Sequence, residues 1–318
     1  MSRTWDATEP LVADTNWGRL PDGWDYVEVA GVGVDVADNV YVFNRGEHPV
    51  IVFDREGNFL RSWGEGVFSR PHGLHVGHDG MVYCTDEGDH TVRKCTPEGR
   101  VLLEIGLPNQ PSPHMSGLPF NRCTHTALSP EGDIYVSDGY GNACVHKYAQ
   151  EGKHLFSWGA PGIEPGNFNV AHNIVCDDLG IVYVADRENH RVQRFDGNGR
   201  YLGQWNNIHR PCALCATRGS NPVFIVGELG PSMPVNVRTP NLGLRVSVLD
   251  QDGNTIERFG KGVPGRGPEH FIAPHGIAVD SRGTIYVGEV AAAAWPRYNP
   301  GTPKPDDLVL LRRLLRKT

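Results

Sequence analysis

Three histidines recur at a regular interval and at one position of a repeated sequence pattern. His72, His172 and His275 lie 100 and 103 residues apart, and each opens a short, mainly apolar segment. Three imidazole nitrogens with an open fourth position are the ligand set of a catalytic zinc site. One histidine at such a place would more often donate to a loop carbonyl, but three equivalent ones predict a single divalent metal ion. We expect zinc, with Fe²⁺, Co²⁺ or Mn²⁺ as alternatives.

The segments that must bring these histidines together are recurring strand pairs. Each has an alternating strand, a turn built on Asp, Gly or Asn, and a second strand that contains an aromatic-Val pair. The clearest copies cover residues 31–46, 72–88, 124–140, 172–189 and 275–290, and a more diverged copy runs from 211 to 260. A third strand and a Gly turn follow most copies. A four-stranded repeat of about 40–50 residues predicts an all-β, six-bladed β-propeller with antiparallel blades.

The predicted ring places the histidines on its second, fourth and sixth blades, about 120° apart around the axis. Val32, Thr124 and Cys212 occupy the corresponding place in the other blades. His125 is displaced by one residue from this register, so we expect it to point off the axis. The whole chain, residues 1–318, is predicted to be one propeller domain with residues 1–23 as an N-terminal extension. Residues 24–30 are expected to close the ring as the outermost strand of the last blade.

An acidic residue follows the histidine position by fourteen residues in several blades, as in Asp86, Asp186 and Glu289. Its recurrence suggests a structural role, in which the carboxylate bonds backbone amides of a turn. The first blade has Arg45 at this place, a candidate for holding an anionic substrate group. Tyr140 and Arg187 could reach the top of the channel.

The sequence resembles peptidyl-α-hydroxyglycine α-amidating lyase, a six-bladed propeller of the NHL-repeat type. The resemblance runs in order from about 31 to 290 and rests on FNRG (43–46), PHGL (71–74), GDIYVSDGYGN (132–142), YVADRENHRVQRF (183–195) and APHGIAVDSRGTIYVGE (273–289). It implies that the three histidines bind zinc, that Tyr140 is the active-site tyrosine, and that Arg45 and Arg187 bind substrate. Enzymes of that family cleave a carbinolamide into an amide and glyoxylate.

Two departures from that family bear on the site. Its structural calcium is bound by carbonyls that map to Val32 and Leu74 and by an Asp that is Gly276 here, so we expect the site without calcium. Ala273 replaces a methionine of the pocket wall. We therefore do not carry the peptide substrate over with the fold.

Three functions are open from the residues. The first is a metal-dependent lyase that acts on a small α-hydroxy-amide or hemiaminal, with Tyr140 as acid/base and Arg45 and Arg187 on a carboxylate. The second is a metal-dependent hydrolase, lactonase- or amidase-like, and the third is a non-catalytic binding scaffold. Pro- and Gly-rich loops at 107–120, 227–243 and 291–306 are expected to form a lid, and they or their borders carry three candidate substrate-binding residues: His114, Glu228 and Arg238.

Composition limits the partners. A net charge of −7 without a basic stripe argues against nucleic acid, and no segment is apolar enough to predict a membrane span. The seven cysteines have irregular spacing, and no pattern of a secretion signal is present. We expect a cytoplasmic protein with a small-molecule substrate. The residues leave its oligomeric state open.

Overall fold

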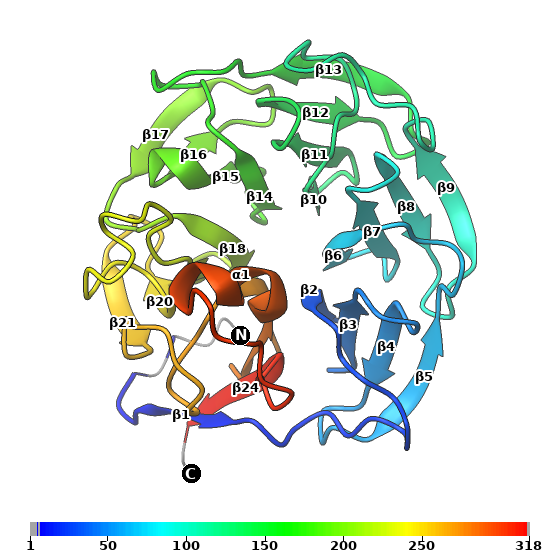
Figure 1. Ribbon diagram of the computed structural model, residues 1–318. Helices are drawn as coiled ribbons and strands as arrows, with labels where there is room; N and C mark the ends of the chain where they lie inside the picture. Colours follow the sequence, from blue (N-terminus) through cyan, green and yellow to red (C-terminus); the bar gives the residue numbers. More distant parts are fainter. Residues whose placement is uncertain (1–4, 6, 317–318) are drawn as a thin grey trace.

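The computed structural model describes residue 5 and residues 7–316, and in this part of the chain six four-stranded antiparallel sheets surround one axis (Figure 1). The predicted six-bladed propeller is confirmed. From the innermost strand outwards, the blades are β2 (Val29–Val34), β3 (Val40–Asn44), β4 (Val50–Phe53) and β5 (Phe59–Trp63); β6 (Pro71–Val76), β7 (Val82–Asp86), β8 (Thr91–Cys95) and β9 (Val101–Ile105); β10 (His125–Leu128), β11 (Ile134–Asp138), β12 (Cys144–Tyr148) and β13 (His154–Trp158); β14 (Ala171–Cys176), β15 (Val182–Asp186), β16 (Arg191–Phe195) and β17 (Tyr201–Trp205); β18 (Pro211–Ala216), β19 (Phe224–Glu228), β20 (Arg245–Leu249) and β21 (Thr255–Phe259); and β22 (Pro274–Val279), β23 (Ile285–Glu289), β24 (Leu311–Arg316) and β1 (Leu11–Asp14).

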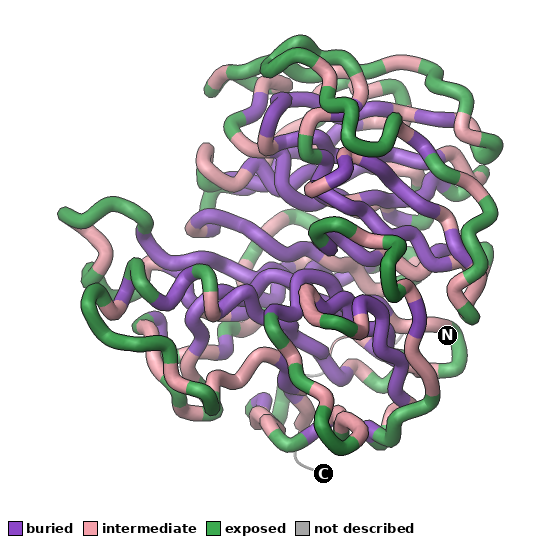
Figure 2. The backbone as a smooth tube through the Cα atoms, turned by 45° about the vertical axis from the view of Figure 1, so that its right-hand side comes forward, coloured by how far each residue is buried: buried purple, intermediate pink, exposed green. Residues whose placement is uncertain are grey.

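Burial decreases from the axis outwards within each blade. Every residue of β3, β7, β11 and β15 is buried, because both faces of these second strands pack against neighbouring sheets. The outermost strands are mostly exposed or partly buried, as in β5 and β9, where only the last residue is buried. Figure 2 shows this as buried strands inside a more exposed surface. The aromatic-Val pairs of the repeat thus fill the spaces between blades.

A buried polar side chain ends the second strand of each blade and holds the loop that leads into that blade. Asp86 Oδ2 accepts from the Ser69 amide at 2.5 Å, and Asp186 Oδ1 accepts from the Asn169 amide at 2.7 Å. The full set is Asn44, Asp86, Asp138, Asp186, Glu228 and Glu289. The structural role predicted for the repeated acids is confirmed.

The first blade carries Asn44, not Arg45, at this position. Asn44 pairs with Val29 as Asp186 pairs with Ala171, and its Oδ1 accepts from the Val27 amide at 3.0 Å. The sequence alignment of the first blade was therefore displaced, because this blade has neither a histidine nor an acid at the two positions that mark the register elsewhere. The residue equivalent to His72 is Ala30, and the expectation of Val32 there was wrong.

The ring closes through an N-terminal strand, but residues 24–30 do not provide it. Strand β1 pairs antiparallel with β24, with Leu11 opposite Arg316 and Asp14 opposite Arg313. Val29 and Ala30 instead begin the buried inner strand β2. The segment between β1 and β2 crosses from the last blade to the first, and there the Trp17 ring lies 4.8 Å from that of Tyr286 and 5.5 Å from that of Phe53. The predicted N-terminal extension therefore contains the closing strand.

Insertions interrupt the repeat on the face shown in Figure 1. Helix α1 (Ala291–Tyr298) lies between β23 and β24, and a short 3₁₀ helix, η1 (Arg187–Asn189), follows β15. No helix in the described residues is long and apolar enough to cross a membrane.

Candidate metal centre

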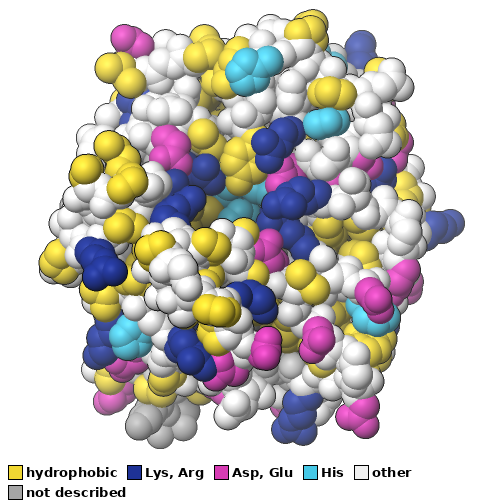
Figure 3. Space-filling model, in the orientation of Figure 1, with side chains coloured by type: hydrophobic (Ala, Val, Ile, Leu, Met, Phe, Trp, Pro, Cys, Tyr) yellow, Lys and Arg dark blue, Asp and Glu magenta, His cyan; other side chains and the backbone are white. Residues whose placement is uncertain are grey.

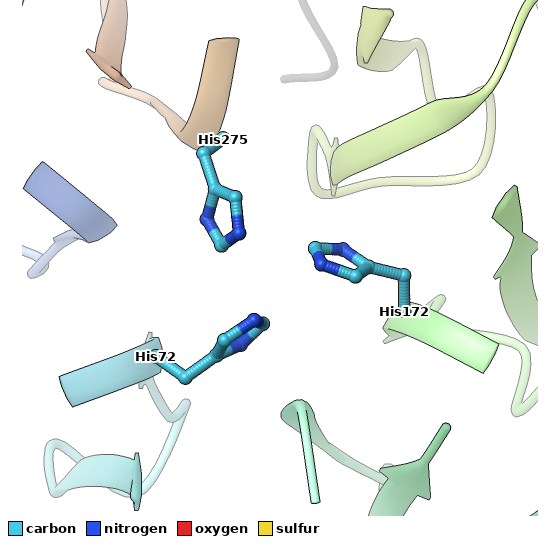
Figure 4. Close-up of side chains that lie close together, drawn as sticks. All are labelled: His72, His172 and His275. Carbon is cyan, nitrogen blue, oxygen red and sulfur yellow. The ribbon is translucent and has the colours of Figure 1, made fainter. Parts of the chain in front are cut away.

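The three histidines meet on the propeller axis. Each is the second residue of an innermost strand, β6, β14 or β22, and their rings converge from alternate blades (Figure 4). Their ring centroids are 4.7–4.9 Å apart, and each imidazole is at least nine-tenths buried. The convergence predicted from their spacing is confirmed.

The inner strands of the other three blades fix the orientation of these rings. Nδ1 of His72, His172 and His275 lies 2.7 Å from the carbonyl oxygens of Thr124, Cys212 and Ala30, respectively. Because a carbonyl only accepts, each Nδ1 carries the proton and each Nε2 presents its lone pair. Burial lowers the pKa of all three imidazoles well below the usual value, which favours this neutral form.

The hydroxyl of Tyr140 lies beside two of the three Nε2 lone pairs. Tyr140 Oη lies 2.8 Å from Nε2 of His172 and 3.1 Å from Nε2 of His72, and a phenol can donate to only one of them. Nε2 of His275 has no hydrogen-bond partner among the described residues. The ligand atoms of the three histidines lie within 4.8 Å of one another. Neutral imidazoles whose other nitrogen is held by a carbonyl fit a divalent cation such as zinc.

Tyr140 links the histidines to the arginines above them. Nη1 of Arg187 lies 3.3 Å from Tyr140 Oη, and its guanidinium carbon lies 5.4 Å from the centre of the phenol ring. Burial raises the pKa of Tyr140, and the positive charge of Arg187 opposes that shift. The tyrosine therefore stands between the nitrogen lone pairs and a fixed cation.

The two arginines expected at the site occupy equivalent positions. Arg45 follows Asn44 and Arg187 follows Asp186, each directly after the residue that ends the second strand. Arg45 donates from Nη1 to Glu28 at 2.8 Å and from Nε to the Pro71 carbonyl at 2.9 Å. Arg187 donates from Nε to Glu188 at 2.8 Å. Burial lowers the pKa of His72, and the positive charges of Arg45 and Arg187 lower it further.

The three remaining substrate-binding candidates are not brought to this centre. The Glu228 carboxylate is fully buried in the fifth blade, where it accepts from the His209 amide at 2.8 Å and pairs with Arg245 at 2.9 Å. Glu228 is one of the buried polar residues that end the second strand of each blade. The sequence analysis missed this because the fifth repeat has diverged from the others. His114 and Arg238 are exposed, and among the described residues neither side chain bonds to the histidines, Tyr140 or the arginines.

Two cavities lie along the axis on the other side of the histidines. A small one of about 10 Å³ is lined by the three histidines, Asn173 and His125, so His125 faces the axis, contrary to expectation. Beyond it, a cavity of about 1180 Å³ is formed by the far ends of the inner strands. Neither cavity is lined by Tyr140, Arg45 or Arg187. These three side chains therefore lie at the opposite end of the axis, which we call the mouth.

A calcium site beside the last histidine does not fit the residues present. A Cβ atom added to Gly276 would lie 2.8 Å from backbone atoms of Gly31, so this position cannot carry a carboxylate with the strands packed as they are. A second group with metal-binding atoms, Asp138, Cys144 and His146, is buried in the third blade. There the Asp138 carboxylate is already engaged by the Asn121 amide and the Asn142 side chain, as expected for the residue that ends the second strand.

Several residues at the mouth were missed by sequence reasoning. Glu87 occupies the same repeat position as Arg45 and Arg187, so the alignment could have revealed it. Arg70 and Arg122 both lie two residues before the histidine position of their blades, before His72 and Thr124, so the same alignment could have revealed them. All three belong to one ion-pair network (Arg70–Glu87 2.7 Å, Arg122–Glu87 2.5 Å).

Comparison with known proteins places the chain among NHL-repeat propellers. Residues 168–195 match the NHL repeat. Human NHL repeat-containing protein 3 is 30% identical over 305 residues, which cover 90% of this chain and 83% of that protein. Peptidyl-α-hydroxyglycine α-amidating lyase 1 of Drosophila melanogaster is 31% identical over 252 residues, which are 74% of this chain and 45% of that protein. A streptogramin B lyase structure shares the fold (TM-score 0.60, 14% identity, 97% of this chain and 98% of that chain). The chain belongs to the NHL-repeat family of six-bladed β-propellers, which includes NHL repeat-containing protein 3 and relatives named as amidating lyases.

Proposed function

We propose that the protein is a metal-dependent lyase that cleaves the carbon–nitrogen bond of a small α-hydroxy-amide bearing a carboxylate. The observation that carries this proposal is the position of Tyr140 Oη, within 3.1 Å of Nε2 on both His72 and His172 and 3.3 Å from Nη1 of Arg187. One proton-carrying group thus lies between nitrogen ligands and a cation that can hold an anionic substrate. The name of the Drosophila relative, an amidating lyase, supports the same chemistry.

His72, His172 and His275 would hold the metal ion through Nε2. When bound there, a divalent ion, zinc in our proposal, polarises a substrate hydroxyl and lowers its pKa. Each Nδ1–H is held by a backbone carbonyl, so each imidazole already has the tautomer that can bind the metal ion through Nε2.

The residues of the mouth would hold and orient the substrate. We assign the substrate carboxylate to Arg45 and Arg187, whose guanidinium groups match its two oxygens. Arg187 also contacts Tyr140, so a carboxylate on Arg187 brings the adjacent hydroxyl-bearing carbon towards the phenol oxygen. Orientation of this kind lowers the entropic part of the barrier.

Tyr140 would move the proton. In N–CH(OH)–CO₂⁻, the hydroxyl O–H bond breaks, its electron pair forms the carbonyl of glyoxylate, and the C–N bond breaks. The amide nitrogen then needs one proton. The phenol oxygen can accept the proton of the hydroxyl while giving its own to the nitrogen, so that the products are an amide and glyoxylate and Tyr140 ends protonated as it began.

The test is glyoxylate release from an N-acyl-α-hydroxyglycine. Tyr140→Phe is expected to lower kcat at least about 100-fold, the usual contribution of a positioned acid/base group. Tyr201→Phe is the matched control, because in the described part of the chain that hydroxyl has a single hydrogen bond, to Gln204 on an outermost strand. Equal rates in Tyr140→Phe and wild type would refute the assignment. Hydrolysis of an ester or lactone without glyoxylate release would favour the hydrolase, and a protein without metal or turnover would favour a binding scaffold.

The expected setting is part of the same proposal. We propose a small-molecule substrate, with neither nucleic acid nor membrane as partner, and a cytoplasmic location. All seven cysteines are free thiols, which supports a reducing compartment.

A further inference from the structure

The mouth above the histidines is lined by more guanidinium groups than the proposed substrate carboxylate needs. Figure 3 shows Lys and Arg side chains around a hollow with histidine at its base. Two of the arginines in this region, Arg70 and Arg122, have side chains that are 51% and 49% exposed. They form an outer pair, above the inner pair of Arg45 and Arg187, whose side chains are 9% and 14% exposed.

The outer pair is held in place by one buried carboxylate. Glu87, whose side chain is 3% exposed, lies 2.7 Å from Arg70 Nε and 2.5 Å from Arg122 Nη2. Arg45 approaches the same carboxylate at 3.6 Å. A rigid acid that anchors long side chains at an exposed rim reduces the entropy they lose when they bind a ligand.

Part of each anchored guanidinium remains available. Glu87 accepts hydrogen bonds from Nε and Nη2 of Arg122. Nη1 of Arg122 has no hydrogen-bond partner among the described residues. Only Nε of Arg70 is taken, and neither of its Nη atoms has a described partner. These donors project from the rim, where an anionic group could accept from both side chains.

The outer pair is also close to the reacting end of the site. The Arg122 guanidinium carbon lies 4.9 Å from the centre of the Tyr140 ring. Arg70 is bound to the same Glu87 carboxylate as Arg122, so the two guanidinium groups lie beside each other. A ligand only a few atoms long could therefore span from Tyr140 Oη to these two arginines.

The charge balance of the mouth favours a ligand with two negative charges. Five guanidinium groups in this network are paired with three carboxylates, which leaves an excess of two positive charges. The groups are Arg45, Arg70, Arg122, Arg187 and Arg210, with Glu28, Glu87 and Glu188. One substrate carboxylate on the inner pair would neutralise only half of this excess among the side chains, and a divalent ion held by the histidines would add two further positive charges, so a second anionic group on the substrate is favoured.

We infer that the substrate is a small dianion: besides the carboxylate on Arg45 and Arg187, it carries a second anionic group, a carboxylate or a phosphate, bound by Arg70 and Arg122. This inference rests on the proposed function for the position of the first carboxylate. It makes Arg70 and Arg122 determinants of specificity, and the amide portion of the substrate the segment that joins the two acids.

Binding of two matched ligands tests the inference separately from turnover. N-Succinylglycine has a carboxylate at each end, whereas N-butyrylglycine has only one, and neither has the hydroxyl needed for reaction. By calorimetry, the wild-type protein loaded with zinc is expected to bind the dianion at least about tenfold more tightly, the factor given by one charge-assisted pair of about 1.4 kcal/mol. The double variant Arg70→Gln/Arg122→Gln should lose that preference.

Arg218→Gln is the control, since Arg218 is similarly exposed and pairs with Asp178 beside the opposite cavity. If the double variant does not fold, the two single variants replace it, because each leaves Glu87 with two arginines, and each should lower the preference. Equal affinity of the wild type for both ligands, or a preference that survives in the variants, overturns the inference. A preference for the dianion without glyoxylate release from its α-hydroxy form would instead refute the lyase and leave the anion site standing.

Discussion

The ion pair of Glu188 with Arg187 allows the contribution of charge pairs at the mouth to the free energy of unfolding to be measured. Glu188 lies 2.8 Å from Arg187 Nε and 2.7 Å from Arg210 Nη2, and its own side chain is 24% exposed. These two arginines lower the pKa of Glu188 from 4.5 to about 2, against the opposing effect of burial. Replacement by Gln removes the charge while preserving the size of the side chain.

The pKa of Glu188 sets the expected magnitude. At about 1.36 kcal/mol per pKa unit, the shift corresponds to about 3.4 kcal/mol as an upper bound. Because the pair is partly exposed, screening by solvent reduces this to about 1–2 kcal/mol. The folded pKa is below the unfolded one, so the stabilisation is complete above about pH 4.5 and is lost as the pH falls towards 2.

The assay is urea unfolding of the wild type and Glu188→Gln at about pH 7 and about pH 3. The free energy of unfolding should differ by about 1–2 kcal/mol at the higher pH and by less than about half of that at the lower pH. Glu151→Gln, at an exposed position, serves as the control. A difference that is the same at both pH values would refute the argument, because it would arise from packing and not from the charge.

Three further outcomes are expected. His172→Ala should retain less than about a tenth of the metal bound by the wild type when measured by elemental analysis, because only two nitrogen ligands remain, while His78→Ala should retain it all. Glu228→Ala should lower the free energy of unfolding by about 3–5 kcal/mol in urea, because Arg245 and a loop amide lose their buried partner. Trp17→Ala should cost about 3–5 kcal/mol in the same measurement, and a cost below about 1 kcal/mol would contradict the role of this ring in joining the first and last blades.

The repeat made the fold and the histidines predictable because both depend on local pattern. Alternating strands, Asp or Gly turns and aromatic-Val pairs occur within each blade, so they can be recognised from the residues alone. Errors occurred where the pattern is interrupted. The first blade has Ala30 and Asn44 where the second has His72 and Asp86, so neither marker residue was present and Arg45 was given the place of Asn44.

Ring closure could not be derived from local pattern in the same way. Residues 24–30 (WDYVEVA) largely alternate between apolar and polar side chains, whereas residues 11–14 (LVAD) do not, so the local pattern favoured the wrong segment. The choice depends on the antiparallel register of β1 with β24, which lies at the other end of the chain, and on the packing of Trp17 between the two blades. Arg70 and Arg122 share one position of the repeat, but the contact of Arg122 with Tyr140 joins side chains from two different loops and cannot be derived from the pattern of one blade.

In the histidine centre, the side chains could be predicted from the sequence, but the backbone carbonyls that orient them could not. The histidines on alternate blades must be histidines, because each has to donate from one nitrogen and present a lone pair on the other. Their partners, Ala30, Thr124 and Cys212, contribute only a backbone carbonyl, so unrelated side chains serve equally well. The position of these carbonyls is determined by the ring of six inner strands. The three-fold arrangement of the ligands is therefore a property of the closed propeller, and a change that opens the ring should disturb metal binding without altering a single ligand.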